Sequence, residues 1–189
     1  MSFLLFSSPL AARRAFLGRS GLLLSGAAVA LLAGREALAQ KSGGARPDDI
    51  AILNTALAAE LEAVAAYQVG TESGLLEKPV LSLASQFQGH HKEHADVLAK
   101  TIGKLGGKPV AAKAKYQFPT DRLKSQADVV RFAASLEKGA VSAYLGAVPL
   151  FRQRDLSRAA ASILGDEAMH LAVLRQALGE NPVPEAFVS

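Results

Sequence analysis

The sequence predicts an all-α protein built as a four-helix bundle. No stretch after residue 48 alternates apolar and polar residues as a half-buried strand does, and helix start and stop signals divide the chain into four long segments joined by unequal connections. Half of the 189 residues are hydrophobic and a fifth are charged, which is sufficient for a packed core. Cysteine is absent, so disulfides, zinc–thiolate sites and cysteine nucleophiles are excluded.

Residues 1–39 have the pattern of an export signal. Arg13 and Arg14 precede Phe-Leu and an apolar stretch, and Ala37-Leu38-Ala39 forms a small-residue cleavage site before Gln40. The paired arginines resemble a twin-arginine signal, which predicts transfer by the twin-arginine export machinery to the periplasm. The apolar run is shorter than the roughly 20 residues that span a bilayer, so we expect no stable membrane anchor after cleavage.

The basic charge of the chain is concentrated in this segment. The whole chain carries a formal net charge of +4, and four arginines and one glutamate give residues 1–39 a charge of +3, which leaves +1 for the rest. A nucleic-acid-binding surface needs a concentrated basic stripe, and none remains after residue 39. We therefore expect no nucleic-acid partner.

The first helix is predicted over residues 49–69. Residues 40–48 before it are Gly-rich and polar, which is typical of a flexible linker. Two aspartates, at 48 and 49, supply hydrogen-bond acceptors at the start of the helix, and Gly70 and Gly74 mark its end.

Three further helices follow. The second is predicted over 78–103, with a proline in its first turn and glycines after its end. The third is predicted over 125–147, opened by a Ser-x-x-Asp capping sequence. The fourth begins at Asp155 or Ser157 and ends at Gly179.

The lengths of the connections predict the topology. About eight residues join the first helix to the second and the third to the fourth, so each pair forms an antiparallel hairpin. The middle connection, 104–124, has about 20 residues. At roughly 3.3 Å per extended residue it can run the length of a helix. The predicted architecture is two hairpins joined by a long crossover.

Two of the predicted helices carry a glutamate and a tyrosine seven residues apart. Glu60 lies among apolar residues in the first helix, and Tyr67 follows it; Glu137 and Tyr144 repeat the arrangement in the third helix. At 100° per residue, seven steps return to within about 20° of the starting direction, so each pair shares one helix face.

The other two helices carry pairs three residues apart, a spacing that also places both side chains on one face. Glu167 and His170 form a Glu-x-x-His pair in the fourth helix. His91 and His94 occupy the corresponding places in the second helix.

These positions form an internal repeat. Glu137 follows Glu60 by 77 residues, and His170 follows His94 by 76. A Glu from each of two helices plus a Glu-x-x-His pair from each of the others is the carboxylate dimetal pattern of four-helix bundles. On these residues the chain resembles the ferritin-like superfamily over nearly the full length that follows the signal. It is similar in particular to exported bacterial proteins with a ferritin-like domain, a group that also resembles plant desiccation-related proteins.

The resemblance implies a ferritin-like four-helix bundle over 49–189 with metal at its centre. It implies iron, as two ions, with manganese or zinc as alternatives. Tyr67 and Tyr144 would lie beside the metals, where their hydroxyls can hydrogen-bond a ligand carboxylate. The ligands that it implies are Glu60, His94, Glu137, Glu167 and His170.

His91 departs from the pattern, because the family usually has a glutamate there. If His91 binds, the site has three carboxylates and three imidazoles, one negative charge fewer than the family pattern, and stabilises ferric ions less well. This weakens the expectation of ferroxidase activity and makes zinc, manganese or mixed sites easier to accommodate.

Three classes of function follow from the resemblance. The first is a metal-binding protein with a role in stress or metal homeostasis. The second is a di-iron oxidoreductase or ferroxidase acting on iron or reactive oxygen species, with the tyrosines as electron donors. The third is an apo interaction module, which is disfavoured because buried carboxylates are costly without a cation. Homo-oligomerisation stays open.

Several of these residues also have simpler explanations. His90, His91 and His94 could form a solvated cluster, and Glu62 and Glu93 are expected to be exposed because they are rotated away from the candidate ligands. The spacing from His90 to His94 is that of a zinc protease helix, but that motif requires Glu directly after the first His.

Replacing Arg13 and Arg14 together by Lys is expected to stop export, because the receptor recognises the paired guanidinium groups rather than charge alone. The measurement is accumulation of the protein in the periplasm, with Arg19→Lys as the control. Continued export of the double variant would contradict the twin-arginine assignment.

Overall fold

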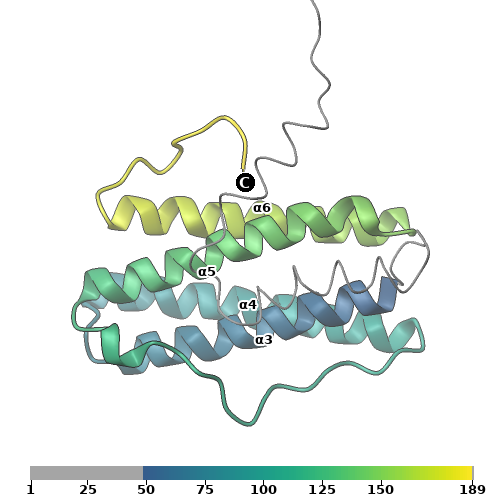
Figure 1. Ribbon diagram of the computed structural model, residues 1–189, viewed down its shortest axis with the longest axis horizontal. Coiled ribbons are helices and arrows are strands. Elements are labelled where there is room, and N and C mark those ends of the chain that lie inside the picture. Colours follow the sequence, from purple (N-terminus) through teal and green to yellow (C-terminus); the bar gives the residue numbers. More distant parts are fainter. Residues whose placement is uncertain (1–48, 189) are drawn as a thin grey trace, which may run out of the picture.

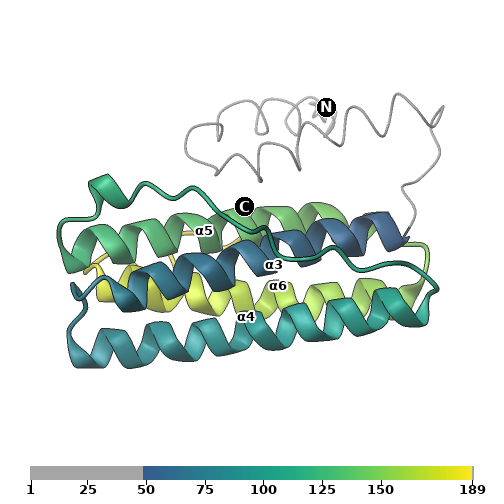
Figure 2. The ribbon, with the colours of Figure 1, turned by 90° about the horizontal axis from the view of Figure 1, so that it is seen from below.

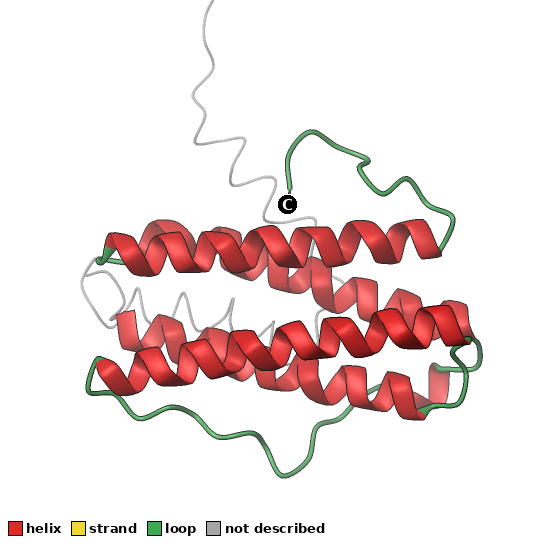
Figure 3. Ribbon diagram, turned by 180° about the vertical axis from the view of Figure 1, so that it is seen from behind, coloured by secondary structure: helices red, strands yellow, loops and turns green. Residues whose placement is uncertain are grey.

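The computed structural model describes residues 49–188, so the predicted export signal (1–39) and linker (40–48) lie outside the described residues. No strand occurs within 49–188, and the four predicted helices are present (Figure 3). The predicted all-α four-helix bundle is therefore confirmed. The elements are α3 (Asp49–Glu72), α4 (Lys78–Lys104), η1 (Thr120–Arg122), α5 (Gln126–Ala147), η2 (Val148–Leu150) and α6 (Arg154–Ala177).

The bundle consists of two antiparallel hairpins. α3 packs along α4, α5 packs along α6, and the hairpins meet mainly between α3 and α5 (Figure 1). Residues 105–125 run back along the bundle, so α5 starts at the end of the molecule where α4 also starts (Figure 2). Asn54 holds this crossover: its side-chain nitrogen donates to the Lys108 carbonyl (3.2 Å), and its side-chain oxygen accepts from the Val110 N–H (2.8 Å).

The helix ends mostly follow the sequence signals. Ser125 caps α5, and its hydroxyl accepts from the backbone N–H of Asp128 (3.3 Å). α3 continues to Glu72, beyond the predicted end, because Gly70 stays within the helix. A Cβ on Gly70 would lie only 3.2 Å from a methyl of Val129, so glycine here allows α3 to approach α5 closely. The helix ends before Gly74, which has a φ of 70°.

The start of α3 is tied to the start of α6. The Asp49 carboxylate accepts hydrogen bonds from the backbone N–H groups of Arg152 (2.8 Å) and Gln153 (3.3 Å). Asp49 is 5% exposed. It thus stabilises the connection between α5 and α6 as well as the first turn of its own helix.

The core is divided into two apolar clusters with a polar layer between them. One contains Leu57 and Ile102 near the ends of the bundle where α3 starts and α4 ends, and the other contains Phe87 and Leu174 toward the opposite end. By length and mean hydropathy α3 could cross a membrane, but here it is a core helix that buries Leu57 and Glu60 against its neighbours.

Candidate metal centre

The polar layer contains all six of the candidate ligands predicted from the sequence. Five of them are at most 2% exposed, and the side chain of His94 is 15% exposed. The chain therefore buries three carboxylates and three imidazoles between two apolar clusters, where the effective dielectric is low. The six residues are Glu60 on α3, His91 and His94 on α4, Glu137 on α5, and Glu167 and His170 on α6.

His91 lies at the middle of this layer. Its Nδ1 is 2.9 Å from Glu60 Oε2 and its Nε2 is 3.3 Å from Glu137 Oε1. Its Nδ1 is also 3.6 Å from Glu167 Oε1. One imidazole thus contacts the carboxylates of α3, α5 and α6 at once.

Glu167 directs its two oxygens to opposite sides. Oε1 is 3.2 Å from His94 Nδ1, whereas Oε2 is 3.6 Å from His170 Nδ1. Two groups of ligand atoms result, and within each group all atoms lie within 4.8 Å of one another. Both groups contain His91 and Glu167; the first is completed by Glu60 and His94, and the second by Glu137 and His170.

The two tyrosines link the hairpins. Tyr144 donates to Glu60 Oε1 (2.5 Å), and Tyr67 donates to Glu137 Oε1. Each tyrosine therefore hydrogen-bonds the glutamate of the other hairpin. A separation of seven residues places each tyrosine about 10 Å along its helix from the glutamate on the same helix. These bonds fix the carboxylate orientations.

The pKa values of the histidines in the layer are shifted by burial and by contacts with neighbouring carboxylates. Burial opposes protonation of His91, but hydrogen bonds to Glu137 and Glu60 outweigh it and raise the pKa of His91 from 6.5 to about 11. For His94 and His170 burial acts in the same direction, but ion-pair contacts of 3.2–3.6 Å with neighbouring carboxylates outweigh it and raise each pKa to about 9. The three imidazoles are therefore charged at neutral pH in the metal-free protein.

The opposite shift is found at Glu137. Burial would raise its pKa, but the ion-pair contact with His170 (3.6 Å) and the hydrogen bond with His91 (3.3 Å) hold the pKa below its ordinary value of 4.5. Burial, followed by the charges of nearby carboxylates, raises the pKa values of Tyr67 and Tyr144 well above 10. The tyrosines are thus neutral donors.

Five polar atoms of the layer have no hydrogen-bond partner within the described part of the chain. They belong to four of the candidate ligands, and all of them carry or can expose a lone pair. Buried polar groups are nearly always paired, and a mixed set of carboxylate oxygens and imidazole nitrogens suits divalent transition ions. The donor set therefore fits a metal pair. The five atoms are His94 Nδ1, Glu137 Oε2, Glu167 Oε1, Glu167 Oε2 and His170 Nδ1.

Sequence reasoning missed Asp166. Its Oδ2 lies 3.4 Å from His94 Nε2 and 3.3 Å from His170 Nε2, so it contacts the outer nitrogens of both imidazoles. A carboxylate in this position orients a ligand imidazole and makes it more basic. The four-residue spacing from Asp166 to His170 was the available signal, since residues at i and i+4 share a helix face.

The expectation that Glu62 is exposed is wrong, whereas Glu93 is exposed as expected. Glu62 is only 9% exposed. It is rotated away from Glu60, as the helix geometry requires, so rotation away from the ligand face does not by itself leave a side chain open to water. The solvated-cluster explanation also fails for His91, which is 1% exposed.

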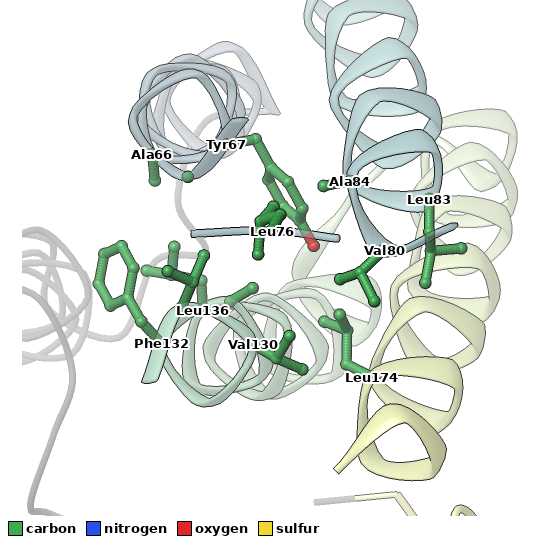
Figure 4. A pocket seen from close by; sticks show the side chains of 13 residues that line it. Ala66, Tyr67, Leu76, Val80, Leu83, Ala84, Val130, Phe132, Leu136 and Leu174 are labelled. Atoms are coloured by element: carbon green, nitrogen blue, oxygen red, sulfur yellow. The ribbon is translucent and has the colours of Figure 1, made fainter. Parts of the chain in front are cut away.

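A small apolar pocket of about 20 Å³ lies beside Tyr67, toward the end of the bundle where α4 begins (Figure 4). Side chains such as Val80, Val130 and Leu174 line it, and it has room for about one water-sized molecule. It offers no set of polar groups for a metabolite. Its apolar lining borders the polar layer on the side of Tyr67.

The fold and the centre together define a class of protein: four-helix bundles that hold carboxylates and imidazoles in the core. The profile of the ferritin-like domain family matches residues 48–180. The chain belongs to this family.

Solved structures support the relationship. A conserved hypothetical protein from Mycobacterium tuberculosis is 27% identical, with a TM-score of 0.64 over 74% of this chain and 96% of that chain. A dodecameric thioferritin from Bacteroides fragilis, described as bacterioferritin-related, is 26% identical, with a TM-score of 0.60 over 69% of this chain and 84% of that chain. No curated protein matches the sequence.

The metal-free protein is expected to lose stability as the pH rises from about 6.5 to 9. In this window the unfolded chain releases the protons of three histidines that the folded chain retains, so unfolding becomes more favourable with rising pH. Glu137 acts in the opposite direction, since its lowered pKa removes stability as the pH falls below 4.5.

The measurement is the thermal midpoint of chelator-treated protein at pH 5.5, 6.5, 7.5 and 8.5, values chosen on either side of the ordinary histidine pKa of about 6.5. His91→Gln, which lacks the imidazole with the largest shift, should show a smaller decline. A midpoint that is constant or rises above pH 6.5 would contradict charged imidazoles.

Proposed function

We propose that the chain is an exported metal-binding protein of the ferritin-like family that holds two divalent ions in its core. Iron is the favoured metal, with manganese or zinc as alternatives, and the role is in metal homeostasis or stress protection. The observation that carries the proposal is the pair of overlapping ligand groups that share Glu167.

The residues of the layer have distinct parts in this function. Glu60 with His94 and Glu137 with His170 would each hold one ion, and Glu167 would face both. The bound ions would supply positive charge that offsets the three carboxylates and, if they are iron, a capacity for one-electron chemistry. Tyr67 and Tyr144 orient the outer carboxylates through hydrogen bonds.

His91 favours binding over oxidation as the main activity. An imidazole adds no negative charge, so the layer has three carboxylates to stabilise a higher oxidation state of iron, and raising the charge of an ion is harder with fewer anionic neighbours. The di-iron oxidoreductase is the second candidate, supported by the two tyrosines beside the carboxylates. An apo interaction module is the third.

Two further parts of the proposal concern the whole protein. Export by the twin-arginine route is supported by Arg13-Arg14 and the cleavage site after Ala39. A homo-oligomer is supported by the dodecameric state of the bacterioferritin-related neighbour from Bacteroides fragilis.

Elemental analysis of the protein purified from the periplasm tests the central part. We expect about two transition-metal ions per chain, because the layer provides two ligand groups. Glu167→Gln should lower the content of both ions, since this residue belongs to both groups, while Glu93→Gln, an exposed change on α4, should leave it unchanged. Protein that takes up no metal even when reconstituted would contradict the proposal and favour the interaction module.

His91→Glu is expected to keep the fold and to increase the rate of iron oxidation. The substitution supplies a fourth carboxylate at the centre of the layer, where its charge stabilises ferric iron. The measurement is aerobic oxidation of added ferrous iron by wild type and variant at equal metal loading.

Comparison with truncations completes this test. If His91 adjusts the properties of the site, His91→Ala should weaken metal binding less than His94→Ala does. A His91→Glu variant that is no faster, or a His91→Ala variant that loses metal as completely as His94→Ala, would show that His91 is an essential ligand.

A further inference from the structure

A second cluster of ligand-type side chains lies just outside the buried layer. His90 on α4 places its Nδ1 2.9 Å from Nε2 of His170 and 3.2 Å from Oδ2 of Asp166. The third edge, from His170 Nε2 to Asp166 Oδ2, is 3.3 Å. Two imidazole nitrogens and one carboxylate oxygen therefore form a compact triangle between α4 and α6.

The triangle has the dimensions of one face of a metal coordination shell. Zinc and similar ions bind imidazole nitrogen and carboxylate oxygen at about 2.0–2.2 Å, which in tetrahedral geometry separates neighbouring ligand atoms by about 3.3–3.5 Å. The three observed edges are equal to this spacing or slightly shorter. An ion could sit just above the plane of the triangle after a small outward movement of His90.

The cluster is open on one side and fixed on the other. The side chains of His90 and Asp166 are 34% and 24% exposed, so solvent can reach them and complete the coordination of an ion. The side chain of His170 is 2% exposed, and its ring stacks on Phe87 with the ring centres 4.0 Å apart. The buried imidazole is thus held with its Nε2 directed into the cluster.

We propose that His90, Asp166 and His170 form a third metal site, which binds one divalent transition ion at the surface and passes it to the buried pair. His170 provides the connection, because its Nε2 faces this outer cluster while its Nδ1 faces Glu137 and Glu167. The outer site itself stands independently of the proposed function, whereas the transfer to the buried pair rests on it.

A neutral imidazole has one lone pair and one N–H, which makes the two sites compete for His170. An ion on Nε2 requires the proton on Nδ1. For an ion to be held at Nδ1 instead, that proton would have to be lost to solvent and one taken up from solvent at Nε2, where it could be donated to Asp166, so the imidazole would stay neutral. The outer site would therefore lose its ion as the second buried ligand group gains one.

The outer site is tested on its own in a background that lacks the inner ligands. The double variant Glu60→Gln, Glu137→Gln removes one carboxylate from each buried group and leaves the outer triangle intact. Titrated with Co²⁺, this variant is expected to bind one ion, seen as visible absorption bands with the intensity of a low-coordinate site. Adding His90→Gln should weaken that binding at least about 100-fold, since loss of a direct ligand exceeds the 10–100-fold effect of an outer contact.

Controls separate the outcomes. Glu93→Gln in the same background should bind Co²⁺ normally, and circular dichroism with thermal unfolding should verify that each variant is folded. Absence of Co²⁺ binding in the folded double variant, or binding that survives His90→Gln, would overturn the outer site. If wild type binds one ion that depends on His90 and not on Glu137, the outer site stands and the buried metal pair fails.

The transfer is tested by the rate of loading in the otherwise unchanged protein. His90→Gln should fill the buried pair to the same final content but at least about 10-fold more slowly when Co²⁺ is mixed with metal-free protein, since one ligand of the receiving site is lost. Equal loading rates of wild type and His90→Gln would overturn the receiving role.

Discussion

Three carboxylates and three imidazoles share one layer in the middle of the bundle, and none of them could be buried there alone. Isolated charges in a protein core are strongly unfavourable, and removing one partner of a buried pair leaves the other uncompensated. His91 compensates the buried carboxylates because its imidazole contacts Glu60, Glu137 and Glu167 together. Apolar clusters above and below the layer exclude water and strengthen each of these contacts.

The negative charge of this layer can be balanced in two ways. In the metal-free protein three imidazolium groups offset three carboxylates, which is why the histidine pKa values are raised and that of Glu137 is lowered. With metal, two divalent ions would take the place of the protons. Metal affinity and acidity are therefore linked in this protein, and uptake is favoured at higher pH. The self-neutralised state also makes the metal-free bundle less costly than a row of unpaired carboxylates would be.

Much of the architecture is determined by local patterns that are visible in the sequence. Spacings of three and seven residues place Glu60 with Tyr67, and Glu167 with His170, on single helix faces, and the internal repeat indicates which faces meet. The length of the crossover then selects the topology. These features are local or repeated, so they could be predicted without coordinates.

Other features depend on how the helices approach one another. Asp166 lies next to Glu167 in the chain, and its contacts with His90 and His94 arise only because α4 and α6 meet at that point. The close approach of Val129 to Gly70 likewise depends on how α5 packs against α3. Helical periodicity gives the direction of a side chain but not the partner that covers it.

The most direct measurement of the central claim is the number of protons released when metal enters the layer at pH 7. Titration of metal-free protein with Zn²⁺ in two buffers of different ionisation enthalpy gives this number calorimetrically. The account predicts release of about two protons per chain as the two buried groups fill, one each from His94 and His170, whose imidazoles would each hold one ion. Metal binding with no release of protons would show that the imidazoles are neutral beforehand and would contradict the account.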